Sequence, residues 1–182
     1  MSSSSSSSSS EDYPFSDHKL IPFFAEREES SPIFDFAFDG KNVYAGTGPD
    51  GKIIFSKDRY VWDTFYITGD INVKAIAILN GYLYAGTGPD GKVYRINLSD
   101  NTVTEFSALM SDVKGIEVFN GEVYVVAERI IYKYNVLTGN LDLNYEPYAP
   151  VSSSKVLGGN LFITMDNENV IHYDGNEWEL LR

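Results

Sequence analysis

The 182-residue chain contains no cysteine and only two histidines. The absence of cysteine excludes a disulfide framework, a thiol nucleophile and a cysteine-ligated zinc site. Two histidines also leave little material for a metal centre built on imidazole ligands. We therefore expect no metal, no cofactor and no catalytic residue, and the sequence favours a protein that is not an enzyme.

Basic residues are scarce as well. Lysine and arginine number 14 against 26 aspartates and glutamates, which gives a formal net charge of −12. An acidic protein repels the phosphates of nucleic acids and of anionic lipids, so we expect neither as a partner. No apolar run approaches the roughly 18 residues that a membrane span requires, so membrane insertion is not expected either.

The N-terminus lacks the features of a secretory signal peptide. Met1 is followed by nine serines, whereas a signal peptide has a positively charged start and an apolar stretch. We therefore expect a protein that is not secreted by this route. Its expected location is the cytoplasm or, if it is viral, the virion or the host cytoplasm during assembly.

Residues 1–30 are predicted to form an extended N-terminal arm, because prolines at positions 14 and 22 disfavour a helix or a central strand. The serine run cannot bury apolar surface. The arm nevertheless carries large apolar side chains, which are Tyr13, Phe15, Leu20, Ile21, Phe23 and Phe24. Such a segment lies on its own domain, docks on another subunit or stays solvated. The second alternative predicts that these six residues bind a partner.

The chain does contain an internal repeat of about 40 residues, which is the strongest signal in the sequence. Residues 43–52 read VYAGTGPDGK, and residues 83–92 repeat them as LYAGTGPDGK. The Asn-Gly pair at residues 80–81 returns at residues 120–121 within a similar apolar pattern, and a weaker fourth copy lies at residues 159–163. The chain is therefore built from about four copies of one unit.

Each unit is predicted to contain four short strands. In the second unit the alternating runs cover residues 73–79, 82–86, 92–98 and 102–107. Asn-Gly between two such runs indicates a tight hairpin in which both turn residues have positive φ. Pro-Asp-Gly between the second and third runs is a further turn signal.

A repeated four-stranded antiparallel unit of this length is typical of a β-propeller blade. The sequence therefore predicts an all-β fold, a small propeller of about four blades at residues 31–69, 70–109, 110–149 and 150–182. Two arrangements are open: a ring closed within one chain, and an open arc completed by a second copy as a homo-oligomer. Small residues are predicted on the inner strands, at Ala37, Ala75, Ala77 and Gly115. They would ease tight packing near an axis, which favours the single-chain ring.

The repeat resembles the blades of Kelch, NHL and sensor propellers over residues 31–182. The chain departs from WD40 blades, since Trp62-Asp63 occurs once, and from Kelch blades, since paired glycines occur only at residues 158–159. Blades with short arms are also similar, more loosely, to propeller-type structural proteins of tailed bacteriophage virions. That resemblance implies a tail, baseplate, neck or capsid accessory protein.

Aromatic residues fall into a repeating and a non-repeating group. Tyr44, Tyr84 and Tyr124 occupy the same position in successive blades. Phe162 follows at that position in the last blade, and this recurrence indicates packing between blades. Six aromatic residues do not recur in this way and are candidates for surface binding of sugar or protein: Tyr60, Trp62, Tyr66, Tyr82, Tyr145 and Tyr148.

Together these features predict a non-enzymatic, structural or interaction propeller whose arm attaches it to the protein subunits of a larger assembly, such as a virion. One alternative is a lectin-like propeller that binds glycan between its blades. The other is a hydrolase or lyase with its site at the channel mouth. For that alternative the charged residues to inspect are Arg59, Arg95, Glu117 and Arg129.

Overall fold

The computed structural model describes residues 31–106 and 111–181, which form 16 strands and no helix. The predicted N-terminal arm and its six apolar candidates lie outside the described residues. Over the described ranges the chain accordingly has no helix suited to spanning a membrane.

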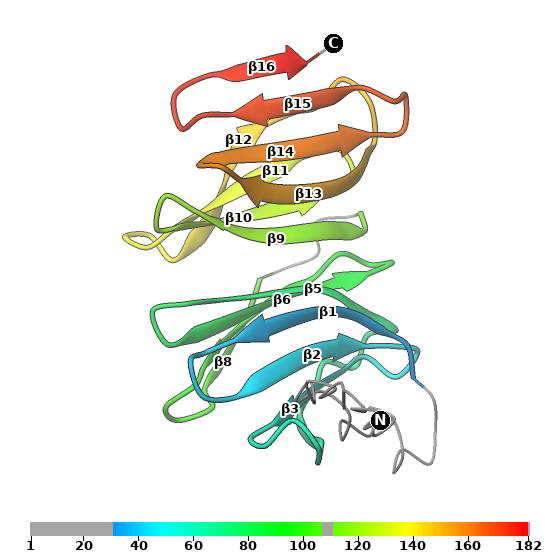
Figure 1. Ribbon diagram of the computed structural model, residues 1–182, viewed down its shortest axis with the longest axis vertical. Helices are drawn as coiled ribbons and strands as arrows, with labels where there is room; N and C mark the ends of the chain where they lie inside the picture. Colours follow the sequence, from blue (N-terminus) through cyan, green and yellow to red (C-terminus); the bar gives the residue numbers. More distant parts are fainter. Residues whose placement is uncertain (1–30, 107–110, 182) are drawn as a thin grey trace, which may run out of the picture.

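The strands form four sheets, each with four antiparallel strands in chain order (Figure 1). Blade 1 contains β1 (Ile33–Phe38), β2 (Val43–Thr47), β3 (Lys52–Ser56) and β4 (Asp63–Ile67), and blade 2 contains β5 (Asn72–Leu79), β6 (Tyr82–Gly88), β7 (Val93–Asn97) and β8 (Val103–Phe106). Blade 3 contains β9 (Val113–Phe119), β10 (Glu122–Ala127), β11 (Ile131–Asn135) and β12 (Asn140–Tyr145), and blade 4 contains β13 (Val151–Leu157), β14 (Asn160–Met165), β15 (Val170–Tyr173) and β16 (Trp178–Leu181). The predicted all-β class with four four-stranded blades is confirmed.

The repeated turns adopt the backbone conformations that their residues favour. Asn80 and Gly81 have φ values of 50° and 77°, and the equivalent Asn-Gly pair of blade 3 has 51° and 75°. These positive values are those of a two-residue hairpin turn. In the other repeated turn Gly51 and Gly91 also have positive φ, and the peptide bonds before Pro49 and Pro89 are cis.

The blades pack face to face in chain order but do not close into a ring. Among the inner strands, β1 packs against β5, β5 against β9 and β9 against β13, whereas β13 and β1 do not pack together in this way within the described residues. Blades 1 and 4 lie at opposite ends of the long axis (Figure 1). The expectation of a ring closed within one chain is therefore wrong, and the chain forms an open arc.

The small inner-strand residues have a different role from the one predicted. Ala37 packs between blades 1 and 2, and Ala75 and Ala77 are buried between blades 2 and 3. A Cβ atom on Gly115 would collide with the Ser154 hydroxyl, so β9 and β13 also approach closely. Small side chains here let neighbouring inner strands approach each other, and this does not require a closed four-blade axis.

Three apolar clusters fill the three junctions between successive blades, and we use "junction" for such a contact. The repeating tyrosines lie in these clusters, with Tyr44, Tyr84 and Tyr124 only 4%, 4% and 2% exposed. The Tyr84 ring packs edge-on against Tyr134 of blade 3, with 5.5 Å between centroids. The prediction that these tyrosines pack between blades is confirmed.

Candidate interaction surfaces

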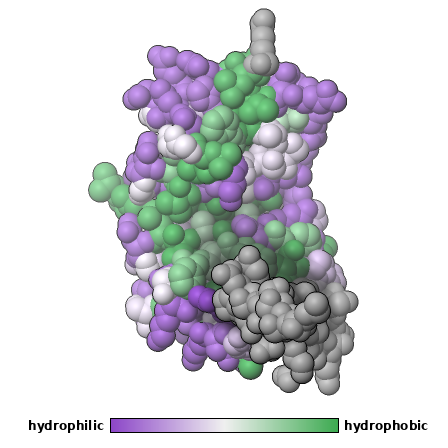
Figure 2. Space-filling view, viewed as in Figure 1, coloured by the Kyte–Doolittle hydropathy of each residue, from purple (hydrophilic) through white to green (hydrophobic). Residues whose placement is uncertain are grey.

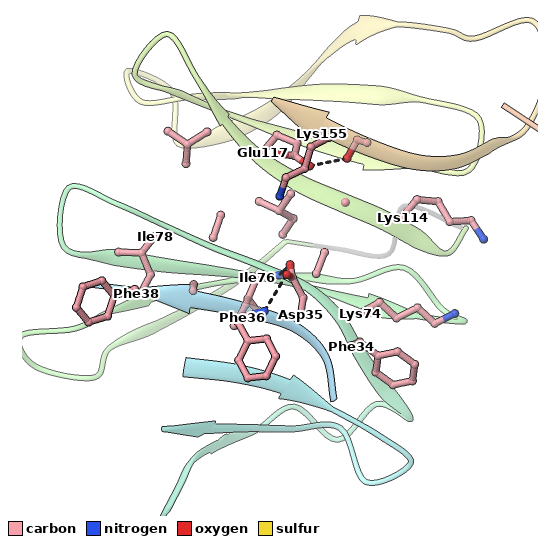
Figure 3. Close-up of a pocket in the computed structure, with 17 residues that line it drawn as sticks. Phe34, Asp35, Phe36, Phe38, Lys74, Ile76, Ile78, Lys114, Glu117 and Lys155 are labelled. Carbon is pink, nitrogen blue, oxygen red and sulfur yellow. Dashed lines mark hydrogen bonds between the residues drawn. The ribbon is translucent and has the colours of Figure 1, made fainter. Parts of the chain in front are cut away.

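The inner strands of all four blades line a groove with a volume of about 400 Å³, which we call the axial groove (Figure 3). Figure 2, drawn in the same orientation as Figure 1, shows apolar surface in the middle of the molecule, over the inner strands. Phe34, Phe36 and Phe38 lie along β1 at one side of the groove (Figure 3). The groove therefore combines an aromatic edge with a charged centre.

Two carboxylates form that centre. Asp35 accepts a hydrogen bond from the Ile76 backbone N–H at 2.9 Å, and Glu117 accepts one from the Ser154 hydroxyl at 2.9 Å (Figure 3). Burial raises the pKa of both carboxyl groups, although these hydrogen bonds and the charge of Lys155 act in the opposite direction. The charge of Asp35 also raises the pKa of Glu117, so the two groups are electrostatically linked.

A lysine pair lies farther along the groove. Asp112, which precedes β9, forms ion pairs with Lys74 and Lys114. Its carboxylate oxygen lies 2.8 Å from the Lys74 ammonium nitrogen and 3.0 Å from that of Lys114. Burial raises the pKa of Asp112, but the hydrogen bonds and charges of the two lysines outweigh it, and the net pKa is lowered. The Lys74 contact joins blade 2 to blade 3.

The structure does not bring together the charged residues inspected for an enzyme. Glu117 lines the axial groove, but Arg59 and Arg129 are exposed in the β3–β4 and β10–β11 turns. Arg95 lies on β7, at a separate pocket. Among the residues that the structure describes, no three acidic, histidine or cysteine side chains gather as a metal site would require.

Sequence reasoning missed Asp35 and Lys155 as groove residues. Asp35 stands where the second and third repeats have Ala75 and Gly115. Lys155 pairs with Phe162 as Glu117 pairs with Tyr124, so Lys155 and Glu117 occupy equivalent positions. A charged residue that replaces a small or oppositely charged one on an inner strand is the signal that could have identified this site.

A second pocket, of about 710 Å³, lies between blades 2 and 3, and we call it the rim pocket. The Arg95 guanidinium lies 4.7 Å from the centroid of the Tyr82 ring and donates a hydrogen bond to the Tyr134 hydroxyl. Burial and the neighbouring Tyr134 raise the pKa of Tyr84, another lining residue, to about 12. The Tyr84 phenol is therefore neutral at pH 7.

The six non-repeating aromatic candidates are scattered. Tyr82 lines the rim pocket, and Trp62 is half-buried just before β4. Tyr66 packs on Tyr94 of blade 2 at 5.8 Å, and Tyr145 stacks on Trp178 of blade 4 at 4.6 Å. The two exposed ones are Tyr60, at 71%, and Tyr148, at 56%. The six do not form one surface, and whether any of them binds a ligand stays a prediction.

The two end blades each present a face that no other blade covers in the described residues. On blade 1 we define the outward face by Phe36 and Phe38, which are 51% and 54% exposed. On blade 4 we define it by Phe162 and His172, which are paired across β14 and β15. The Phe162 ring is half-buried and stacks on His172, with 5.7 Å between centroids.

Comparison with known proteins supports the fold. No family model matches the chain, and no curated protein matches it. Among solved structures, the computationally designed Ika4 protein is 17% identical with a TM-score of 0.65, and the match covers 80% of this chain and 92% of Ika4. The WD40 β-propeller domain of Doa1 is 17% identical with a TM-score of 0.68, covering 82% of this chain and 53% of that one.

A streptogramin B lyase structure is 15% identical with a TM-score of 0.69, and the match covers 81% of this chain and 53% of the lyase chain. The chain thus spans about half the length of the Doa1 and lyase structures. At these identities the similarity concerns the fold alone. The four-blade arc is therefore a β-propeller fold.

Proposed function

We propose that this propeller is a non-enzymatic interaction module that binds protein through the outward face of blade 1. The observation that carries the proposal is the exposure of Phe34 and Phe38 on β1, at 44% and 54%. Two large aromatic rings at the edge of a concave groove form an apolar patch of the kind that marks protein interfaces.

The repeat supports the same conclusion. Phe36 and Phe38 correspond to Ile76 and Ile78, 40 residues later. Both isoleucines pack in the junction between blades 1 and 2. The sequence thus places on blade 1 the apolar residues that elsewhere face a preceding blade, and such a face is stabilised when another surface covers it.

Attachment to a larger assembly through residues 1–30 is the finer part of this proposal. Its support is the set of six apolar side chains between positions 13 and 24. A virion as the assembly, and the cytoplasm as the alternative location, remain predictions from the sequence.

Site-specific photo-crosslinking tests the protein-binding role. A photo-reactive amino acid replaces Phe38 in the full chain, and the matched control replaces Leu137, which is 94% exposed in the β11–β12 turn, away from the outward face. In the cells that make the protein, we expect a discrete protein adduct from position 38 and none from position 137. Equal labelling at both positions, or no adduct at position 38, would contradict the proposal.

The rim pocket supports a second candidate function, which is glycan binding. It lies between two blades, as the lectin-like alternative expects, and it combines the Tyr82 ring with the polar groups of Arg95, Glu122 and Lys133. On a glycan array, binding that is lost in Tyr82→Ala but retained in Tyr148→Ala would support this function. An array without hits would remove it.

A further inference from the structure

We infer that the partner of the outward face of blade 1 is blade 4 of a second copy of this chain, so that two open arcs complete one ring. The inference rests on the proposed function, because it names the protein that covers the apolar face. It follows from comparing the two end faces with the three junctions inside the chain.

Blade 4 presents the aromatic half of a junction. In the ladder of blade 3, Tyr124 pairs with Glu117 and Lys133, and Tyr124 is 2% exposed because blade 4 covers it. In blade 4, Phe162 occupies the equivalent position and pairs with Lys155 and His172. Phe162 therefore points the way that Tyr124 does, toward the side on which a fifth blade would stand.

Blade 1 presents the opposite half of the same junction. Ile76 and Ile78 of β5 pack against blade 1, and Ile116 and Val118 of β9 pack against blade 2. Phe36 and Phe38 hold the corresponding positions on β1. The two ends of the arc are therefore complementary halves of one interface that already recurs three times within the chain.

A second copy satisfies both ends at once. Although β1 and β13 both line the axial groove, they do not pack together as neighbouring blades within the described residues, and blades 1 and 4 lie at opposite ends of the molecule (Figure 1). Two arcs related by a two-fold axis along the channel place blade 4 of each copy against blade 1 of the other, and this closes the assembly.

The outward face of blade 4 is more polar than the internal junctions. Four of its polar side chains nevertheless form two pairs: His172 lies 3.2 Å from Glu179, and the Ser153 hydroxyl lies 2.6 Å from that of Thr164. Since buried polar groups are tolerated when they are hydrogen-bonded, a second blade can cover this face. We expect this intermolecular junction to be weaker than the internal ones and therefore dependent on protein concentration.

Sedimentation velocity of the full chain over a range of concentrations tests the inference. We expect a reversible species of twice the 20.3 kDa chain mass. Phe38→Asp and Leu157→Asp place a charge on each end face at sites that are 54% and 57% exposed, so both variants should fold, with circular dichroism as the check. Both should sediment as monomers, whereas the control Leu137→Asp should still dimerise.

Three results would overturn the inference. The first is a monomer at all concentrations, and the second is an open series of larger oligomers. In the third, dimers form only after residues 1–30 are deleted, which would assign the face to the chain's own arm. Photo-crosslinking from position 38 distinguishes failure of this inference from failure of the proposed function. An adduct with a different protein would rule out the second copy as the partner but leave the interaction role intact. No adduct would rule out both.

Discussion

Blades 1 and 2 have nearly the same repeat text but different surroundings. Ile76 of blade 2 is 3% exposed because blade 1 covers it, whereas Phe36 at the equivalent position of blade 1 is 51% exposed. The residue type is apolar in both blades, so the exposure reflects the place of each blade in the arc. Blades 3 and 4 show the same contrast on their other faces, since Tyr124 is buried and Phe162 is half-buried.

The largest effect should come from removing the aromatic residue of an internal junction. Tyr124→Ala deletes a ring packed against Phe119 and Tyr173, and we expect it to lower the free energy of unfolding by about 3–5 kcal/mol, as for other large buried aromatics. At a protein concentration where the chain is monomeric, Phe162→Ala should cost clearly less. Urea denaturation measures both, and equal losses would contradict the assignment of Phe162 to an open face.

A smaller effect is expected where two blades approach closely. A Cβ atom at Gly46 would lie 2.6 Å from the backbone carbonyl oxygen of Val73, which cannot move without shifting β5. We expect Gly46→Ala to cost about 1–3 kcal/mol, the usual range for overpacking. Gly115→Ala is the matched control, because its obstacle is the rotatable Ser154 hydroxyl. A thermal melt in which Gly115→Ala is the more damaging variant would argue against close packing of blades 1 and 2.

The axial groove provides a pH-dependent test. Because burial raises the folded-state pKa of Glu117 above its unfolded value, its contribution to stability is present at low pH and is lost as the pH rises through the folded pKa. Glu117→Gln keeps an acceptor for Ser154 and removes this loss. We expect the stability of the variant relative to wild type to improve from pH 4 to pH 7. A stability difference between Glu117→Gln and wild type that stays the same from pH 4 to pH 7 would contradict the account.

The smallest effect should come from the ion pairs of Asp112. Its carboxylate is only partly buried, and such pairs contribute about 0–1 kcal/mol. Since the folded-state pKa of Asp112 is lowered, this contribution is present at neutral pH and is lost as the pH falls through the folded pKa. Asp112→Asn should therefore be slightly less stable than wild type at pH 7 and match it at acidic pH. A loss that persists in acid would point to a role other than ion pairing.

The sequence predicts the blades well because turn chemistry is local. Asn80-Gly81 needs positive φ wherever it occurs, and the tyrosines repeat because each faces a similar neighbour. Ring closure was wrongly predicted because it depends on the angle between whole blades, which no short motif encodes. The same limit explains why Asp35 and Glu117 were not paired in advance, and why Arg59 and Arg129 do not converge with them.

The central claim is that the two ends of the arc are halves of one junction, and cysteine crosslinking tests it most directly. The natural chain has no cysteine, so Phe38→Cys and Phe162→Cys chains can be made singly and mixed without background thiols. A short bis-maleimide should join one chain of each kind in high yield, with little product from either variant alone. Similar yields from the mixture and from the single variants, or no crosslinked pair, would contradict the claim.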